Sequence, residues 1–219
     1  MDAETIPALP EPVPALPEPP GAQYAGALAF FRLLNRWFMV PACRAGLGSW
    51  VSTPLGGYMV LLRVRGRKSG IVRETPLNYV VANGAAWVLA GFGPKTEWYR
   101  NLLADPAVEI ILPGRRTPMA ALATEVRDPA VRLLHIPEVM RSTAGPSLAS
   151  GMNPWTTTDE AAAELMAWVP LIRLDPADGP LEAGPDDPGG RAWVWRQALV
   201  VVPSVLALDG LRRLLRPRG

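Results

Sequence analysis

The sequence is poor in the side chains that most often carry chemistry, because its 219 residues include one cysteine and one histidine. The single cysteine, Cys43, excludes an internal disulfide and a zinc site built from cysteines. The single histidine, His135, excludes a metal site with several histidine ligands and argues against a Ser-His-Asp triad. It lies in the stretch PAVRLLHIPEVM, where we expect it on the surface of a helix. We therefore expect no metal, no catalytic side chain that can be named from sequence, and chemistry supplied by a bound cofactor.

Strong charge of one sign and long apolar runs are also scarce. The formal net charge is only +2, and the basic residues are not interleaved with exposed aromatics, so we expect no nucleic-acid partner. The apolar stretch 192–208 is interrupted by Arg196 and Gln197 and is short for a spanning helix. It fits a helix packed on the domain or on a second subunit, a helix at a membrane interface, or a marginal membrane anchor. Trp193 and Trp195 at one end suit a bilayer interface.

Proline and glycine divide the chain into segments. Proline is concentrated near the N-terminus in IPALPEPVPALPEPPG, which favours an extended polyproline conformation and predicts a disordered arm over residues 1–22. A folded domain is predicted over residues 23–178. The stretch GPLEAGPDDPGG predicts a linker over residues 179–190, followed by an apolar and basic helix over residues 191–219.

Within the folded part, helical and strand-like patterns alternate. Residues 24–47 predict a helix that Pro41 bends or splits. Three strands, a short helix, two strands, two helices and a last strand follow, with the stretch between residues 142 and 155 as a loop. Hairpin-connected strands indicate an antiparallel sheet. The predicted class is α+β, mainly β: a split antiparallel β-barrel of six or seven strands with flanking helices.

Turn and cap signals fix several of these boundaries. The stretch RKSG closes the first hairpin, and Asn83–Gly84 is the dipeptide most typical of a tight hairpin turn. Asp128 and Pro129 predict the start of a helix that runs to about Arg141. Thr157 and Glu160 have the spacing of a capping box for the next helix.

Positive charge is crowded at the first hairpin turn, in the stretch LLRVRGRKSGIVRE. Five cations fall within eleven residues: Arg63, Arg65, Arg67, Lys68 and Arg73. A turn that offers Lys68, Ser69 and free backbone N–H groups around Gly66 and Gly70 can hold a phosphate by charge-assisted hydrogen bonds. The alternative is a solvated turn whose charges serve solubility.

Three stretches, GRKSGIVRETPLNYV, WVLAGFG and EWYRNLLADPAVEI, together resemble the deazaflavin-dependent nitroreductase family of split β-barrel proteins, which use coenzyme F420. The resemblance covers roughly residues 32–176. It implies an F420-dependent reductase whose cofactor is an extended anion with a planar ring, a phosphodiester and an oligoglutamate tail. Arg63, Arg65 and Arg73 would guide that tail.

The resemblance also implies which segments bind the cofactor. The basic turn takes the phosphate, the strand after it lines the ring and ribityl path, the loop after the third strand meets the ring through its backbone, and the next helix closes the pocket. The residues so implied are Arg67, Lys68, Ser69, Gly70, Arg73, Thr75, Pro76, Leu77, Asn78, Ala90, Gly91, Phe92, Gly93, Trp98, Tyr99 and Asn101.

Two departures from the family pattern bear on the acceptor. The loop GFGPKTE is shorter than in the nitroreductases, and no tyrosine lies between Ser142 and Trp168. We therefore expect a quinone or another conjugated electrophile in place of a bicyclic nitroimidazole. Met152 and Trp155 are candidates for the acceptor pocket, with simple packing as the alternative.

Three other functions remain open at this point. A non-catalytic F420 carrier would share every binding residue with a reductase. A related barrel could instead bind a flavin mononucleotide, which also needs phosphate contacts, or a haem, which the single histidine disfavours. We expect a cytoplasmic protein, a homodimer, and a peripheral contact at the inner membrane face.

Overall fold

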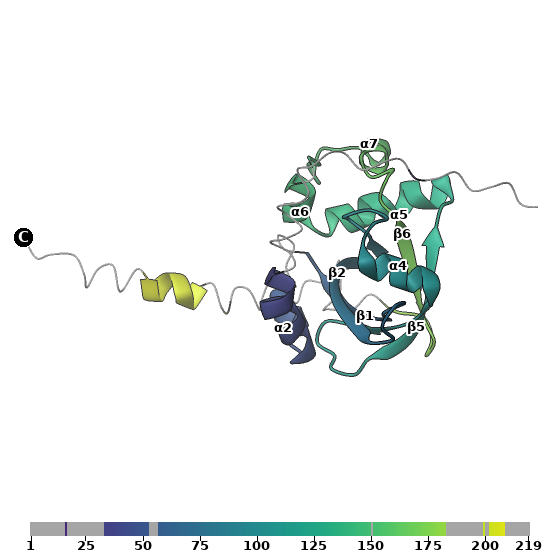
Figure 1. Ribbon diagram of the computed structural model, residues 1–219. Helices are drawn as coiled ribbons and strands as arrows, with labels where there is room; N and C mark the ends of the chain where they lie inside the picture. The colour runs from purple at the N-terminus through teal and green to yellow at the C-terminus, as the bar shows by residue number, and fades with distance from the viewer. Residues whose placement is uncertain are drawn as a thin grey trace, which may run out of the picture.

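The computed structural model describes residues 16, 33–52, 57–149, 151–182, 199 and 202–208. Most of the predicted arm, linker and C-terminal helix lies outside these residues. Figure 1 shows a barrel with helices packed around it. Its strands form one closed antiparallel sheet in the order β1-β2-β3-β6-β5-β4. The predicted split barrel is confirmed, with six strands.

The strands pair mostly with their neighbours in sequence, and pairing of β1 with β4 closes the barrel. At the second hairpin Asn83 and Gly84 have φ values of 51° and 74°, as the predicted tight turn requires. The strands are β1 Met59–Arg65, β2 Val72–Ala82, β3 Ala85–Leu89, β4 Ala107–Ile111, β5 Met119–Val126 and β6 Leu171–Pro176.

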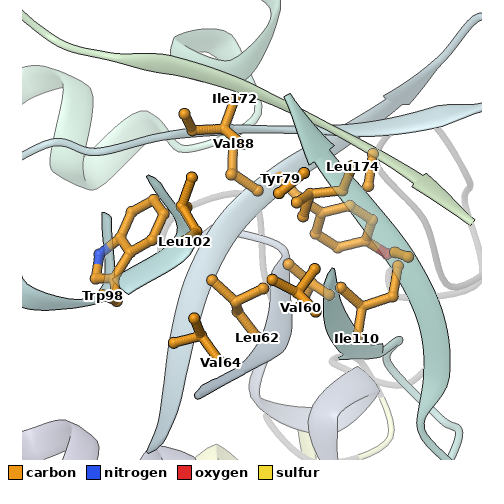
Figure 2. Packing of buried hydrophobic residues seen from close by; sticks show 14 of the residues in the cluster. Val60, Leu62, Val64, Tyr79, Val88, Trp98, Leu102, Ile110, Ile172 and Leu174 are labelled. Carbon is orange, nitrogen blue, oxygen red and sulfur yellow. The ribbon is translucent and has the colours of Figure 1, made fainter. Parts of the chain in front are cut away.

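The barrel interior is a packed core, as Figure 2 shows. Alternate residues of β1, Val60, Leu62 and Val64, are 0–1% exposed and meet inward-facing side chains of the other strands. A fully buried side chain of this size contributes about 1.5–3 kcal/mol. Trp98 and Leu102 of the helix α4, Glu97–Ala104, extend this core beside Val64.

The helices flank the barrel. They are η1 Asn35–Met39, α2 Val40–Arg44, α3 Gly48–Val51, α4 Glu97–Ala104, α5 Pro129–Arg141, α6 Ala144–Ala149 and α7 Asp159–Leu165. The chain changes from a π-helical turn to α2 at Val40, so Pro41 lies in the first turn of α2, where its missing N–H has no helical acceptor to lose. The helix α2 buries Cys43 against Leu61 and Ile111. Burial, with a smaller effect of Glu74, raises the pKa of Cys43 to about 11, so it stays an unreactive thiol near neutral pH.

Of the two predicted helix starts, one is confirmed and one is wrong. Asp128 caps α5 by accepting hydrogen bonds from the N–H groups of Ala130 and Val131. The cap of α7 is Thr158, whose hydroxyl accepts from Ala161. Thr157 is one residue too early, because its hydroxyl accepts from the N–H of Asn153 in the preceding turn.

The stretch predicted as a loop contains the helix α6, so that prediction is wrong for residues 144–149. The serine and glycine content suggested a loop. Ser147 nevertheless lies buried, donates its hydroxyl to the carbonyl of Met140, and thereby fastens α6 to the end of α5.

The predicted surface position of His135 is wrong, since the residue is 2% exposed. Its ring stacks on Trp87 of β3 with centroids 3.7 Å apart and an interplanar angle of 20°. Its Nδ1 lies 2.7 Å from Oε2 of Glu138, which gives the buried ring a polar partner. The helix α5 is therefore turned so that His135 faces the barrel.

The C-terminal stretch is described at residues 202–208, which are helical. Its apolar side chains there are exposed, among them Val202, Val205, Leu206 and Leu208. Within the part of the chain that the structure describes, no helix has the length and apolar character needed to cross a membrane.

Candidate cofactor-binding site

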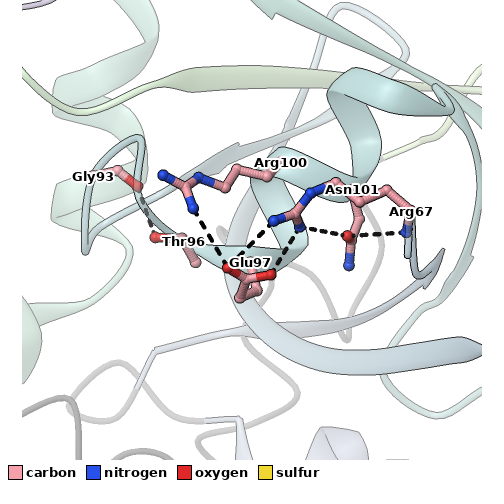
Figure 3. A network of polar contacts seen from close by, with 6 residues as sticks. All are labelled: Arg67, Gly93, Thr96, Glu97, Arg100 and Asn101. Carbon is pink, nitrogen blue, oxygen red and sulfur yellow. Dashed lines mark hydrogen bonds and ion pairs between the residues drawn. The ribbon is translucent and has the colours of Figure 1, made fainter. Parts of the chain in front are cut away.

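The basic turn lies against the helix α4, as Figure 3 shows. Asn101, 5% exposed, accepts hydrogen bonds at Oδ1 from the backbone N–H of Arg67 (3.2 Å) and from its Nη1 (2.9 Å). Nη1 of Arg67 also pairs with Oε2 of Glu97 at 2.8 Å. The hydrogen bond from Arg67 lowers the pKa of Glu97. Arg67 and Asn101 thus hold the turn beside the helix that carries Trp98.

The backbone of the turn closes on itself. The N–H of Gly66 donates to the carbonyl of Ile71 (2.9 Å), and the N–H groups of Ser69 and Gly70 both donate to the carbonyl of Gly66. The expectation of free N–H groups around Gly66 and Gly70 is therefore wrong. A hairpin loop this tight uses its own donors to form, so side chains are left to bind an anion.

Two of the five cations have carboxylate partners on neighbouring strands and loops. Arg63 lies between Glu74, at 3.2 Å, and Glu109, with which it also forms an ion pair. Nε of Arg65 lies 3.9 Å from Asp105. These pairs join β1 to its surroundings and give both arginines a carboxylate partner within the protein.

Lys68 and Arg73 are the two cations of the turn that remain for a ligand. Both are exposed, and no ion pair within 4 Å involves either of them among the described residues. Cγ of Arg73 lies 4.0 Å from the position that a Cβ on Gly66 would take, and Oγ of Ser69 lies 2.9 Å from it. Ser69 and the stem of Arg73 therefore flank the same glycine.

The strand β2 has an open edge next to this turn. Over residues 72–78 only β1 pairs with it among the described strands, and β3 joins from Tyr79 onward. The N–H of Tyr79 donates to the carbonyl of Tyr58, and the antiparallel alternation then directs the backbone groups of Glu74, Pro76 and Asn78 away from β1. Pro76, which has no N–H, fits this side.

The side chains predicted along this strand have mixed environments. Pro76 is buried on the outer face, and Thr75 and Leu77 are half-buried, with Leu77 packed against the barrel core. Nδ2 of Asn78 lies 3.4 Å from the carbonyl of Tyr58.

The loop after β3 is fixed at both ends. The N–H of Ala90 donates to Pro170 at 2.9 Å, and the hydroxyl of Thr96 donates to the carbonyl of Gly93 at 2.7 Å. Gly93 has a φ of 77°, and a Cβ there would lie 2.9 Å from the ring of Trp168. The loop is therefore fastened to the start of α4, whose residues Glu97 and Asn101 hold the basic turn (Figure 3).

Gly93→Ala is expected to destabilise the protein, because alanine would need both a left-handed backbone and displacement of Trp168. We expect a loss of about 1–3 kcal/mol, measured as the free energy of unfolding in urea. Gly91→Ala is the matched control, since a Cβ at Gly91 meets no atom within 4 Å. Equal effects of the two substitutions would contradict the packing of Gly93 on Trp168.

The aromatic residues predicted to close the cofactor pocket are buried, whereas the two residues predicted for the acceptor pocket differ in exposure. Trp98 and Tyr99 are 7% and 3% exposed, and burial, with Glu125 nearby, raises the pKa of Tyr99. Tyr99 thus faces β5 and not the turn. Met152 is 1% exposed in the core between α5 and α7, whereas Trp155 is 72% exposed. The burial of Met152 agrees with the packing alternative, and the high exposure of Trp155 does not fit packing.

Sequence reasoning missed Glu97 and Thr96, which complete the network around the turn. Glu97 lies four residues before Asn101, so the two face one side of α4. The four-residue spacing and the position of an acidic residue at the start of the helix could have predicted that Glu97 lies on the same side of α4 as Asn101.

Residues 39–145 match the model of the F420H(2)-dependent quinone reductase family, a range just under half of the chain. Most of the barrel is therefore similar in sequence to this family. The match supports an F420-dependent reductase function, as the resemblance implied. The matched range contains the basic turn, the open edge of β2, the loop at Gly93 and α4.

Solved structures show similarity at low identity, and no curated protein matches. A conserved hypothetical protein from Mycobacterium tuberculosis is 21% identical, with a TM-score of 0.42 over 54% of this chain and 72% of that one. A structure described as an F420-H2 dependent reductase is 23% identical, with a TM-score of 0.36 over 53% and 93% of the two chains. The family assignment rests on the sequence match.

The residues around the turn fit the cofactor of this family. Lys68, Arg73 and Ser69 offer two cations and a hydroxyl for an anionic tail. The edge of β2 offers backbone donors and acceptors for a planar ring that forms hydrogen bonds.

Proposed function

We propose that the barrel binds reduced F420 along the basic turn, the edge of β2 at residues 75–78 and the loop 90–93, and reduces a quinone-like acceptor. The observation that carries the proposal is the pair Lys68 and Arg73, which lack carboxylate partners within 4 Å while Arg63, Arg65 and Arg67 have them. Unpaired cations on one turn suit a ligand that brings its own negative charge.

Each segment has a distinct part in this proposal. Lys68, Ser69 and Arg73 hold the phosphate and tail, while Arg67 acts through Asn101 to keep the turn in place. Backbone groups at the edge of β2 orient the ring. Bound in its reduced form, F420 supplies a hydride to the acceptor. The chain itself positions the two partners and excludes water between them.

A two-step titration tests the proposal against its alternatives. We expect the protein to bind reduced F420, followed by fluorescence, and then to reoxidise it when menadione is added, faster than the cofactor does alone. Binding without accelerated reoxidation would favour the non-catalytic carrier. Tighter binding of flavin mononucleotide than of F420 would favour the flavin alternative and overturn the proposal.

We also infer a peripheral membrane contact through the N-terminal helices and the C-terminal stretch. Leu33, Trp37, Phe38 and Trp50 are 46–70% exposed, and Arg36 lies beside Trp37 with its guanidinium 5.5 Å from the ring centroid. Exposed aromatics next to arginines suit a bilayer interface, where a lipid-soluble quinone would be found.

Vesicle sedimentation tests this contact. We expect the chain to sediment with vesicles containing anionic lipid, and Trp37→Ser together with Phe38→Ser to reduce the bound fraction severalfold. Trp155→Ser, which removes a similarly exposed aromatic from the loop before α7, is the control. A homodimer would cover the same surface instead. In that case the two serine substitutions together would lower the sedimentation coefficient from that of a dimer to that of a monomer. They would leave vesicle binding unchanged.

A further inference from the structure

A hollow lies between the helices α5 and α7, and none of its lining residues belongs to the basic turn, the edge of β2 or the loop 90–93. Its volume is about 220 Å³. The lining combines two arginines with apolar side chains: Arg127, Pro129, Arg132, Leu133, Ala163 and Ala167. A hollow of this size is smaller than the roughly 300 Å³ at which pockets for drug-sized ligands begin. Its occupant must therefore be compact.

Arg132 is the unusual member of this lining. It is 9% exposed, and its Nη2 donates to the carbonyls of Met166, Ala167 and Val169 at 3.0–3.2 Å. These contacts explain why one nitrogen of the guanidinium is buried. They do not explain Nη1, which is also buried and has no hydrogen-bond partner. A buried donor without an acceptor is uncommon and costly in folded proteins.

The charge of Arg132 is also uncompensated at close range. Within the described residues, no carboxylate forms an ion pair with it inside 4 Å. Burial lowers the pKa of Arg132, an effect that Glu125 opposes and Arg127 reinforces. An arginine remains protonated even so, which leaves a desolvated positive charge beside the hollow.

The acidic groups nearest this end of α5 have other partners. Oε2 of Glu125 pairs with Arg127 at 3.0 Å, while its Oε1 is buried without a hydrogen bond. Oδ1 of Asp128 accepts from the N–H groups of Ala130 and Val131 at the start of the helix. An anion entering the hollow would therefore meet Arg132 without displacing an existing ion pair of that residue.

We propose that this hollow is a second binding site, which takes a small organic carboxylate with a compact apolar body. Its carboxylate would face the guanidinium of Arg132, with Arg127 at the mouth adding attraction. Its apolar part would contact Pro129, Leu133 and the two alanines of the α7 side. The proposal is independent of F420 binding, because the two sites share no lining residue.

Isothermal titration calorimetry of the full chain with benzoate tests the site. Benzamide, which is neutral and has a similar shape, is the control ligand. We expect saturable binding of benzoate and none of benzamide. Ala163→Leu, which fills the hollow without touching the guanidinium, should weaken benzoate binding at least about tenfold. Arg127→Gln should weaken it by a smaller factor, because Arg127 contributes attraction at the mouth only.

Arg132→Gln can unfold the chain, so the conclusion rests on Ala163→Leu and on the pair of ligands. Each variant is also titrated with F420, and its affinity for F420 should match that of the parent chain. Three results would overturn the proposal. They are no benzoate binding by the parent chain, unchanged benzoate binding by Ala163→Leu, and equally strong binding of benzamide. Loss of F420 binding with benzoate binding retained would count against the proposed function alone.

Discussion

Replacing Lys68 and Arg73 together by alanine is expected to weaken F420 binding about 100-fold, since each contributes a charge-assisted contact worth about a factor of ten. Both side chains are exposed and have no ion pair of their own among the described residues, so their removal should leave the fold intact. Fluorescence titration gives the affinity, and thermal unfolding of the same samples reports the stability.

Arg115→Ala together with Arg116→Ala is the matched control, because it removes the same charge elsewhere. These residues lie in the loop after β4, and antiparallel pairing of Leu61 with Ile111 places that loop at the opposite end of β1 from the basic turn. Affinity should change little in this control. An equal loss in both double variants would indicate a general effect of net charge, and no loss in either would remove the turn from the cofactor site.

Asn101→Leu is expected to loosen the basic turn without removing any residue proposed to hold the phosphate. The substitution leaves the backbone N–H of Arg67 without its acceptor, while Nη1 of Arg67 keeps its ion pair with Glu97. We expect a loss of about 1–3 kcal/mol in the free energy of unfolding, from one donor left unsatisfied. F420 affinity should fall about tenfold because Lys68 and Ser69 lose their fixed position.

Asn101→Asp separates this positioning effect from a direct contact with the cofactor. Aspartate keeps an oxygen acceptor for both donors of Arg67, so stability should largely return. Affinity should return with it if Asn101 acts through Arg67. Restored stability without restored affinity would instead show that the amide group itself contacts F420, as the family resemblance implied.

Most of the barrel could be predicted because its signals are local. Runs of β-branched and apolar residues between turn signals identified the strands, and the turn dipeptide Asn83–Gly84 fixed one hairpin. The cap of α5 at Asp128 was equally local. The start of α7 was misplaced because Thr157 and Thr158 are adjacent and chemically identical, so only contacts with the preceding turn distinguish them.

The site was predictable as a set of segments but not as a set of contacts. The basic turn and α4 do lie together, yet the sequence does not show that Glu74, Glu97 and Asp105 take three of the five cations. Those pairings join positions 11, 30 and 40 residues apart. His135 was misplaced for a similar reason, since the face that α5 presents to β3 depends on the assembled barrel.

The open edge of β2 has a consequence for the behaviour of the protein in concentrated solution. An exposed strand edge is a template onto which a strand of another molecule can add, and such additions lead to aggregation. Pro76 lies in the middle of that edge and offers no donor to an incoming backbone, so it interrupts the ladder that a foreign strand would need. The same stretch can thus stay accessible to a small planar ligand while remaining a poor partner for another polypeptide.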